Sequence, residues 1–516
     1  MRASEAPRKT TFGQASILQH DRQETAVTTM KTLPRIRMLR RLVGIILLGL
    51  MIWSGMGPGS PAWALSLSEE KEIGRKALQQ VRQYFPLVED IELLAYVQSI
   101  VNRITKTLDS TPYQYQVFII NNDTPNAFAI PGGYVFIFRG LIDLMDDEDQ
   151  LASILGHEIG HVEARHISHR IEESRIINIA AIVGVLAALF LGGGGNASSA
   201  LAIGTLAGAQ TLQLQYSREN EEEADRLGFK YLCDSGYNPQ DMVTIMASMS
   251  RTRLQPNSRV PSYLSSHPAL SERIHYLQQL IDKEPIRKKK PAAKSSQGDF
   301  LLMKAVLISD YLDTHVAREK LMAMAQNKDL EAAATFGLAR LDLRENQAEK
   351  ALNKFRQVIL QYPNSPMVLG SMGIAYFHMG RLEEARKVFS SALLVGANNV
   401  ASHFRLAMVL KDMGRTDEAL EHLYQAERLA PMIPEIHYEL GVALGQKNDL
   451  GLAHYYLGSY YRQRKDLKVA IFHYEKARTL LAGVPAKRIE VDEALRELKG
   501  EKVKQDREKE EKKKFH

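Results

Sequence analysis

The stretch His157-Glu158-Ile159-Gly160-His161 predicts the part of the fold around which the rest of the chain is arranged. Residues 149–155, just before it, are mostly good helix formers, so we expect the stretch to lie on an α-helix. Four helical steps of about 100° bring residue i+4 to within about 40° of residue i, so His157 and His161 share one face. Two imidazoles one turn apart can bind one metal ion, and Glu158 can reach a water molecule beside it as a general base.

A second stretch, Ser-Arg-Glu-Asn-Glu-Glu-Glu-Ala-Asp at 217–225, can supply a third metal ligand. Its composition favours a helix, on which Glu221 and Asp225 lie on one face at i and i+4. One carboxylate can then bind the metal while the other orients a ligand imidazole. Spacing alone does not choose Glu221 over its acidic neighbours, and the alternative is a solvated acidic helix face.

Together the two stretches resemble the zinc metallopeptidase family that contains the CAAX prenyl endopeptidase and the heat-shock membrane protease HtpX. Residues 126–137, Asn-Ala-Phe-Ala-Ile-Pro-Gly-Gly-Tyr-Val-Phe-Ile, resemble the strand that leads to the metal helix in that family, and 217–225 resembles its second motif. The resemblance implies a zincin-like fold and one Zn²⁺ per chain. It also implies these roles: metal ligands His157, His161 and Glu221, general base Glu158, and supporting catalytic residue Asp225.

His267 precedes Pro268 in a predicted loop ahead of a new helix. By the same resemblance, we expect His267 to be a regulatory residue or fourth zinc ligand; the alternative is an ordinary loop histidine. Arg218 is a candidate for stabilising the developing oxyanion, although helix packing would explain it equally well. His166 and His169 do not repeat the i+4 relation to His161, so we expect structural or surface roles for them.

Alternating apolar residues predict a strand at 113–120, after a helical stretch at about 67–108. A further strand at about 127–138 is interrupted by Pro131-Gly132-Gly133, which predicts an edge strand with a bulge. An edge strand can accept an extended peptide as an additional strand. We therefore expect polypeptide substrates to bind along this edge, at Asn126, Ala127, Phe128 and Ala129.

The N-terminal 64 residues predict export. A basic cluster at 35–41 precedes an apolar run at 42–53 and then Ala62-Trp63-Ala64, which is the order of a secretory signal. We expect cleavage after Ala64 and a periplasmic protein; the alternative is an inner-membrane anchor formed by 42–53. The single cysteine, Cys233, excludes an intrachain disulfide, and the net charge of +6 is too small and too dispersed to indicate a nucleic-acid partner.

Between the two metal motifs, residues 176–209 contain an apolar run of about 16 residues, then four glycines and a second weakly polar run. The first run is shorter than the roughly 20 residues that a membrane-spanning helix needs. We expect a hydrophobic helical hairpin that is buried core or a lid over the active site. The alternative is peripheral contact with a membrane.

The C-terminal half repeats. Ala317, Ala351, Ala385 and Ala419 recur every 34 residues, and a large apolar residue follows each of them at +4. This period and these residues are the signature of tetratricopeptide repeats, which stack helix pairs into a concave binding surface. The pattern restarts half a repeat early after Ala453, so we expect the last unit to be irregular or a cap.

We therefore predict an α+β chain, mostly α, with a zincin-like metallopeptidase domain followed by an α-solenoid of tetratricopeptide repeats. The predicted parts are a disordered N-terminus with a signal peptide (1–64), the metallopeptidase domain (65–282), a linker (283–297), the repeat domain (298–482) and a charged tail (483–516), disordered or a frayed helix from about Lys499.

We predict an exported zinc endopeptidase whose repeats recruit client proteins. Family members with the same domain order imply a role in outer-membrane protein assembly and quality control, with outer-membrane β-barrel proteins and their assembly machinery as partners. One alternative is a repeat chaperone or scaffold with a latent or inactive zinc site, and another is a membrane-embedded housekeeping protease.

Overall fold

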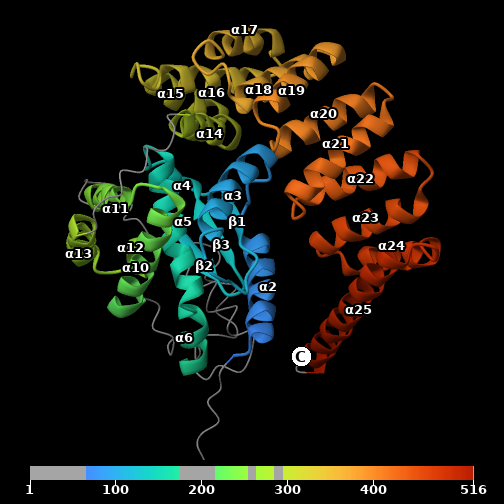
Figure 1. The fold of residues 1–516 in the computed structure, drawn as a ribbon, viewed down its shortest axis with the longest axis horizontal. Helices are drawn as coiled ribbons and strands as arrows, with labels where there is room; N and C mark the ends of the chain where they lie inside the picture. The colour runs from blue at the N-terminus through green and yellow to red at the C-terminus, as the bar shows by residue number, and fades with distance from the viewer. Residues whose placement is uncertain (1–64, 175–215, 254–262, 284–294, 515–516) are drawn as a thin grey trace, which may run out of the picture. The chain divides into compact units, whose positions relative to one another are not determined.

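The structure is a computed structural model that describes residues 65–174, 216–253, 263–283 and 295–514. It is mostly helical and contains a three-stranded sheet (Figure 1). The described residues form one compact unit. The predicted signal segment and the apolar stretch 176–209 lie outside the described residues. None of the helices within the described ranges is both long enough and apolar enough to span a bilayer.

The predicted helical stretch at 67–108 is two helices, α2 (Leu67–Tyr84) and α3 (Ile91–Thr105). α2 begins with a capping box in which Ser66 and Glu69 bond to each other's backbone N–H. It ends because Phe85 is extended, the conformation that the following Pro86 imposes on its predecessor. Asp90 caps α3 by accepting from the backbone N–H groups of Glu92 and Leu93.

The sheet has the order β1-β3-β2, with β1 (Gln116–Ile120) parallel and β2 (Ala127–Ile130) antiparallel to β3 (Tyr134–Phe138). The prediction of a single strand at 127–138 was wrong. These residues form two strands, β2 and β3, joined by a tight turn. Gly132 and Gly133 both have φ of 89°, a left-handed conformation that glycine adopts without a Cβ clash. β2 lies at the edge of this sheet.

The two faces of the sheet pack against different helices, as the period of two along a strand requires. One face contributes Val117, Ile119, Ala127, Val135 and Ile137 to a core shared with α3 and α5 (Glu148–Glu163). The opposite face contributes Ile120, Phe128, Ile130, Phe136 and Phe138 to a core shared with α2. The sheet therefore lies between α2 and α5 (Figure 1), and α5 carries His157 and His161.

The remaining helices of the N-terminal half follow α5 in the chain. α10 begins at a capping box formed by Ser217 and Asn220, and it carries the second predicted motif. The bounds of these helices and of the short helix before α5 are α4 (Arg139–Ile142), α6 (His166–Ser174), α10 (Arg218–Ser235), α11 (Gln240–Arg253), α12 (Tyr263–Ser266) and α13 (Leu270–Lys283).

The C-terminal half is a series of helix pairs. The helices are α14 (Ser295–Tyr311), α15 (Thr314–Met324), α16 (Glu331–Arg344), α17 (Ala348–Val358), α18 (Pro366–His378), α19 (Leu382–Val395), α20 (Val400–Asp412), α21 (Thr416–Leu429), α22 (Pro434–Gln446), α23 (Leu450–Gln463), α24 (Leu467–Leu480) and α25 (Pro485–Lys514). The four alanines of the 34-residue period are fully buried. Their small side chains let paired helices approach closely, which confirms the tetratricopeptide interpretation.

The irregular last repeat has a structural cause. Helix α23 packs against α22 on one side and α24 on the other. Gly441 of α22 meets Leu457 of α23, and Gly458 of α23 meets the ring of Tyr474 on α24. Helix α23 therefore serves as the second member of the pair with α22 and as the first member of the pair with α24, which shifts the repeat pattern by half a repeat. In the predicted tail, α25 is helical and buries Val491, Ala494, Leu495 and Leu498.

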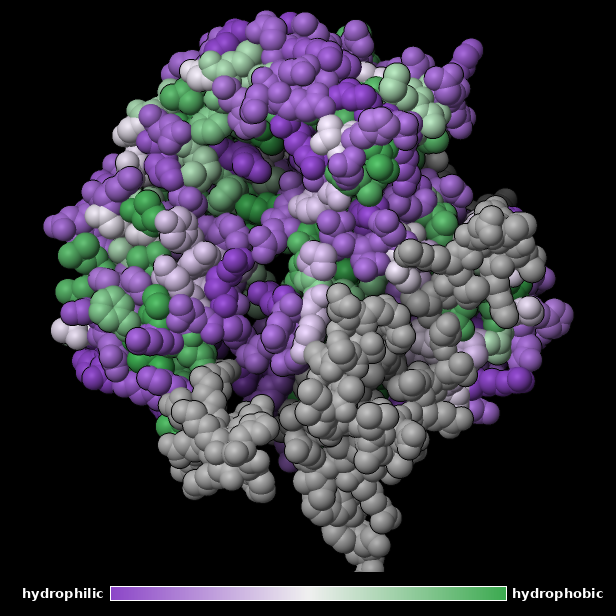
Figure 2. Space-filling model, turned by 180° about the vertical axis from the view of Figure 1, so that it is seen from behind, coloured by the Kyte–Doolittle hydropathy of each residue, from purple (hydrophilic) through white to green (hydrophobic). Residues whose placement is uncertain are grey.

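The described surface is mainly hydrophilic on the face that Figure 2 shows, with hydrophobic side chains scattered over it. Single exposed apolar residues of this kind are ordinary in folded proteins. The side chains with an unusual environment are instead inside, at the contact between α5 and α10.

Candidate metal centre

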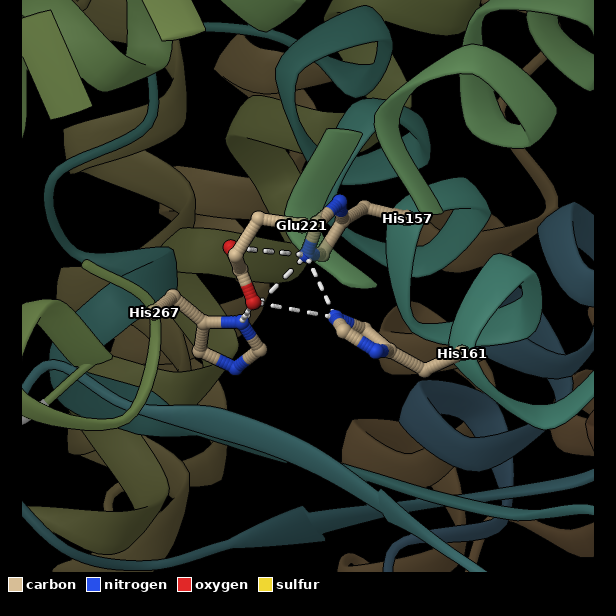
Figure 3. Close-up of side chains that lie close together, drawn as sticks. All are labelled: His157, His161, Glu221 and His267. Atoms are coloured by element: carbon tan, nitrogen blue, oxygen red, sulfur yellow. Dashed lines mark hydrogen bonds and ion pairs between the residues drawn. The ribbon is translucent and has the colours of Figure 1, made fainter. Parts of the chain in front are cut away.

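Four side chains converge on one point in the interior (Figure 3). His157 and His161 come from α5, Glu221 from the first turn of α10, and His267 from the segment between α12 and α13. All four are at most 1% exposed. One ligand atom of each lies within 4.8 Å of those of the other three, so the group can hold a metal ion.

The separations between these atoms are those of a compact ligand set. Nε2 of His157 lies 3.0 Å from Nε2 of His161 and 3.3 Å from Nδ1 of His267. Oε1 of Glu221 lies 2.9 Å from Nδ1 of His267 and 3.4 Å from Nε2 of His161. With zinc–ligand bonds of about 2.0–2.1 Å, the ligands of a tetrahedral ion are about 3.4 Å apart. The observed separations therefore fit a tetrahedral divalent ion.

The chemistry of the donor set also fits a cation. Burial lowers the pKa of His161 well below its usual value, which keeps the imidazole neutral with a lone pair for a metal. Burial by itself raises the pKa of Glu221, but the charges of Arg273 and His267 outweigh it, so the net pKa is well below the usual value. Imidazole lone pairs and an ionised carboxylate are the ligand types that a divalent cation such as zinc binds.

Two glycines let α5 and α10 approach closely enough to form this group. A Cβ on Gly160 would lie 2.7 Å from the carbonyl oxygen of Ala224, and one on Gly228 would lie 3.1 Å from the backbone nitrogen of His157. Glycine at these positions brings the two backbones together, so that Glu221 reaches the histidines from a helix sixty residues away in the chain.

Asp225 lies behind His157, on the side away from the other ligands. Its Oδ1 is 2.8 Å from Nδ1 of His157, which leaves Nε2 to face the ligand group. Arg273 of α13 in turn donates to both oxygens of Asp225, over 2.8 and 2.7 Å, and forms an ion pair with Glu221. Sequence reasoning missed Arg273. It lies six residues after His267, and only the packing of α13 against α10 brings it to the site.

Glu158 is fully buried beside the ligand group, with Oε1 3.6 Å from Nε2 of His267. Among the residues that the structure describes, neither carboxylate oxygen has a hydrogen-bond partner. The same holds for the hydroxyls of Tyr216 and Tyr263, whose rings stack on His161 and His267. Burial raises the pKa of Glu158, against the opposing effect of His267 and His157. These buried polar atoms keep the capacity to form hydrogen bonds with a water molecule or a polar substrate group.

The other predicted site residues lie elsewhere. Arg218 is at the surface, with its side chain 71% exposed and paired with Glu272, so it is outside the buried group. Asn126 is buried just before β2, and Ala127, Phe128 and Ala129 belong to β2 at the edge of the sheet. His166, for which we expected a structural or surface role, is buried and contacts His161 from behind.

The architecture and the site together define a metallopeptidase joined to tetratricopeptide repeats. Residues 93–281, which include all four converging side chains, match the model of Peptidase family M48. Residues 342–407 and 404–453 match two tetratricopeptide repeat models. The chain belongs to Peptidase family M48, whose members depend on a metal ion.

Its curated relatives include the beta-barrel assembly-enhancing protease of Escherichia coli (strain K12), which is 30% identical over 365 residues, 63% of this chain and 73% of the relative. The protein of the same name from Yersinia pestis is 27% identical over 443 residues, 78% of this chain and 88% of the relative. Among solved structures, the tetratricopeptide protein YrrB is 21% identical and covers 35% of this chain and 93% of its own, with a TM-score of 0.27. By its sequence relatives, the chain is similar to proteases of the beta-barrel assembly-enhancing type.

Proposed function

We propose that the protein is a zinc endopeptidase in which His157, His161 and Glu221 hold one Zn²⁺. The observation that carries this proposal is the convergence of these three side chains, from two helices, within one buried ligand group. Zn²⁺ held there would polarise a peptide carbonyl and lower the pKa of a water molecule.

Glu158 is the proposed general base. It takes a proton from the attacking water as the new C–O bond forms, and it returns that proton to the leaving amine as the C–N bond breaks. Its raised pKa makes it a stronger base than a surface glutamate, and its oxygens accept no hydrogen bond from the other described side chains. Asp225 acts through His157 and is therefore a positioning residue, not one that touches the substrate.

His267 is the proposed switch. A catalytic zinc site keeps one position open for water or substrate, whereas a site with four protein ligands is closed. Because Nδ1 of His267 lies within 3.3 Å of both His157 and Glu221, its imidazole takes the fourth position and keeps the enzyme latent. Cleavage then requires the segment between α12 and α13 to move His267 away.

The substrates and the setting of the reaction are also proposals. A polypeptide would bind along β2, from Asn126 to Ala129, and the repeats would recruit client proteins. The names of the relatives support clients among outer-membrane β-barrel proteins, contact with their assembly machinery and a periplasmic location after export. The matched ranges support a metallopeptidase domain within 65–282 and a repeat domain within 298–482. The linker proposed at 283–297 falls where α13 ends, at Lys283, and α14 begins, at Ser295.

Two measurements test the proposal. Metal analysis of the purified protein should find one zinc per chain, with loss of zinc in His157→Ala and Glu221→Gln. Casein cleavage should be weak in the wild type, absent in Glu158→Gln and faster in His267→Ala. If all three proteins bind zinc but cleave no casein, the protein is instead a chaperone or scaffold that acts through its repeats.

A further inference from the structure

His166 lies behind the second histidine of the metal motif. Its Nδ1 is 2.8 Å from Nδ1 of His161, and its Nε2 is 3.2 Å from a carboxylate oxygen of Glu223. The side chain of His166 is 2% exposed, whereas that of Glu223 is 61% exposed. The three side chains thus form a hydrogen-bonded row from the interior of the ligand group to the surface of α10.

The backbone after α5 holds His166 in this place. α5 ends at Glu163, and Arg165 adopts a left-handed φ of 54°, so the chain turns sharply and α6 begins at His166. Such a φ is costly for a residue with a Cβ and persists only where the surroundings fix it. Arg165 is fixed by hydrogen bonds to Glu70, over 2.9 Å, and to the carbonyl oxygen of Leu65, over 2.9 Å.

The direction of each hydrogen bond in the row follows from which ring nitrogen of His161 carries the proton. If Nε2 of His161 uses its lone pair for the metal, the ring proton must be on Nδ1, which then donates to Nδ1 of His166. Nδ1 of His166 accepts, so its proton is on Nε2, which donates to Glu223. A single arrangement of protons satisfies every polar atom in the row.

We propose that His166 and Glu223 are positioning residues that fix the tautomer and orientation of His161 for metal binding. His157 has Asp225 in the equivalent place, so each histidine of the motif has its own acceptor behind it. The two acceptors differ in kind. Asp225 is a buried carboxylate, whereas His166 is a neutral imidazole that passes its hydrogen bond on to an exposed carboxylate.

This inference rests on the proposed metal site, and its test measures metal affinity instead of cleavage. The affinity for Zn²⁺ would be measured by competition with a chromophoric chelator in the full-length wild type, His166→Phe, His166→Asn and Glu223→Ala. The visible spectrum of the Co²⁺-loaded protein would report the ligand geometry. His169→Phe is the matched control, because His169 is an exposed histidine on the same helix.

We expect His166→Phe to weaken Zn²⁺ binding about 10–100-fold and to change the Co²⁺ spectrum, as the loss of an outer hydrogen-bond partner does in other metal sites. His166→Asn should recover part of the affinity, because its side-chain oxygen can accept near the place of Nδ1. Glu223→Ala should cause a smaller loss that shrinks as salt is added, because Glu223 is exposed. His169→Phe should bind as the wild type does.

The results separate this proposal from the one it rests on. If wild type binds no zinc, or His157→Ala binds it equally well, the metal site itself is wrong. If wild type binds zinc and His166→Asn, His166→Phe and Glu223→Ala all bind it as tightly, only the role of His166 and Glu223 is overturned. Thermal unfolding of the metal-free variants identifies any that does not fold, and Glu223→Ala, altered at an exposed side chain, then decides the question.

Discussion

Arg273 holds Asp225 in a bidentate ion pair in the interior, with Nε 2.8 Å and Nη2 2.7 Å from the two carboxylate oxygens. Both side chains are at most 2% exposed. The same guanidinium pairs with Glu221, so one cation from α13 forms ion pairs with two carboxylates of α10. The ligand group therefore depends on a third helix that provides none of its metal-binding atoms.

Replacing Arg273 with Gln should lower the free energy of unfolding by about 3–5 kcal/mol, because it leaves two buried carboxylates without their cation. Arg218→Gln is the control: it breaks an exposed pair between the same two helices, α10 and α13, and should cost about 0–1 kcal/mol. Urea unfolding with and without Zn²⁺ checks this. The Arg273 effect should be largest in the metal-free protein, where no other cation faces Glu221, and equal losses in the two variants would contradict the assignment.

Replacing Gly160 with Ala should destabilise the protein by about 1–3 kcal/mol and weaken metal binding, because the new methyl group would press on the backbone of Ala224. Gly156→Ala is the matched control one helical turn away. There the nearest atom would lie 3.7 Å from the new Cβ, so we expect a gain of about 0.5–1 kcal/mol from the better helix former. Thermal unfolding and zinc content measure both effects. Similar stability and zinc content in the two variants would mean that the helices do not approach as closely as the structure has them.

Asp241 should make the protein less stable as the pH rises. Burial, followed by the charges of Asp147 and Asp149, raises the pKa of Asp241 to about 7. A raised pKa means that the folded state holds the proton more tightly than the unfolded state, whose value is near 3.8. The contribution of Asp241 to the free energy of unfolding is then fully present below about pH 4 and is lost as the pH rises towards 7.

Asp241→Asn should remove this loss. The variant should match wild type near pH 4 and exceed it by about 1–2 kcal/mol at pH 8, after allowance for solvent screening. Urea unfolding at several pH values would show this. Asp234→Asn removes the same charge from a surface pair with Lys230 and should not produce the same pH dependence. A constant difference between Asp241→Asn and wild type at all pH values would refute the prediction.

Removing the metal should destabilise the protein and abolish cleavage together. A ligand at one hundred times its dissociation constant stabilises the folded state by about 2.7 kcal/mol, so treatment with a chelator should lower the unfolding temperature, and added Zn²⁺ should restore it. Glu158→Gln should keep this stabilisation but lack activity, whereas His157→Ala should lack both. Cleavage by a chelated protein with an unchanged unfolding temperature would count against a metal-dependent reaction at this site.

The sequence by itself determined the local features. The i and i+4 spacing of His157 and His161 places both on one face of α5, since the helical period depends only on the backbone. The 34-residue recurrence of alanine determined the repeat architecture, because each repeat packs only against its neighbours. The sequence did not determine the secondary structure of 127–138, because Pro131-Gly132-Gly133 is compatible both with a bulge in one strand and with a tight turn between two strands. The pairing of β2 with β3 decided between them.

Only the tertiary structure decided which distant residues meet. Glu221 has three acidic neighbours of the same chemistry, and the approach of α10 to α5 at Gly160 and Gly228 is what turns Glu221 inward. Arg273 and His166 carry no local pattern that connects them to the ligands. Contacts between elements far apart in the chain arise from how helices pack, and that packing depends on the side chains of every element at once.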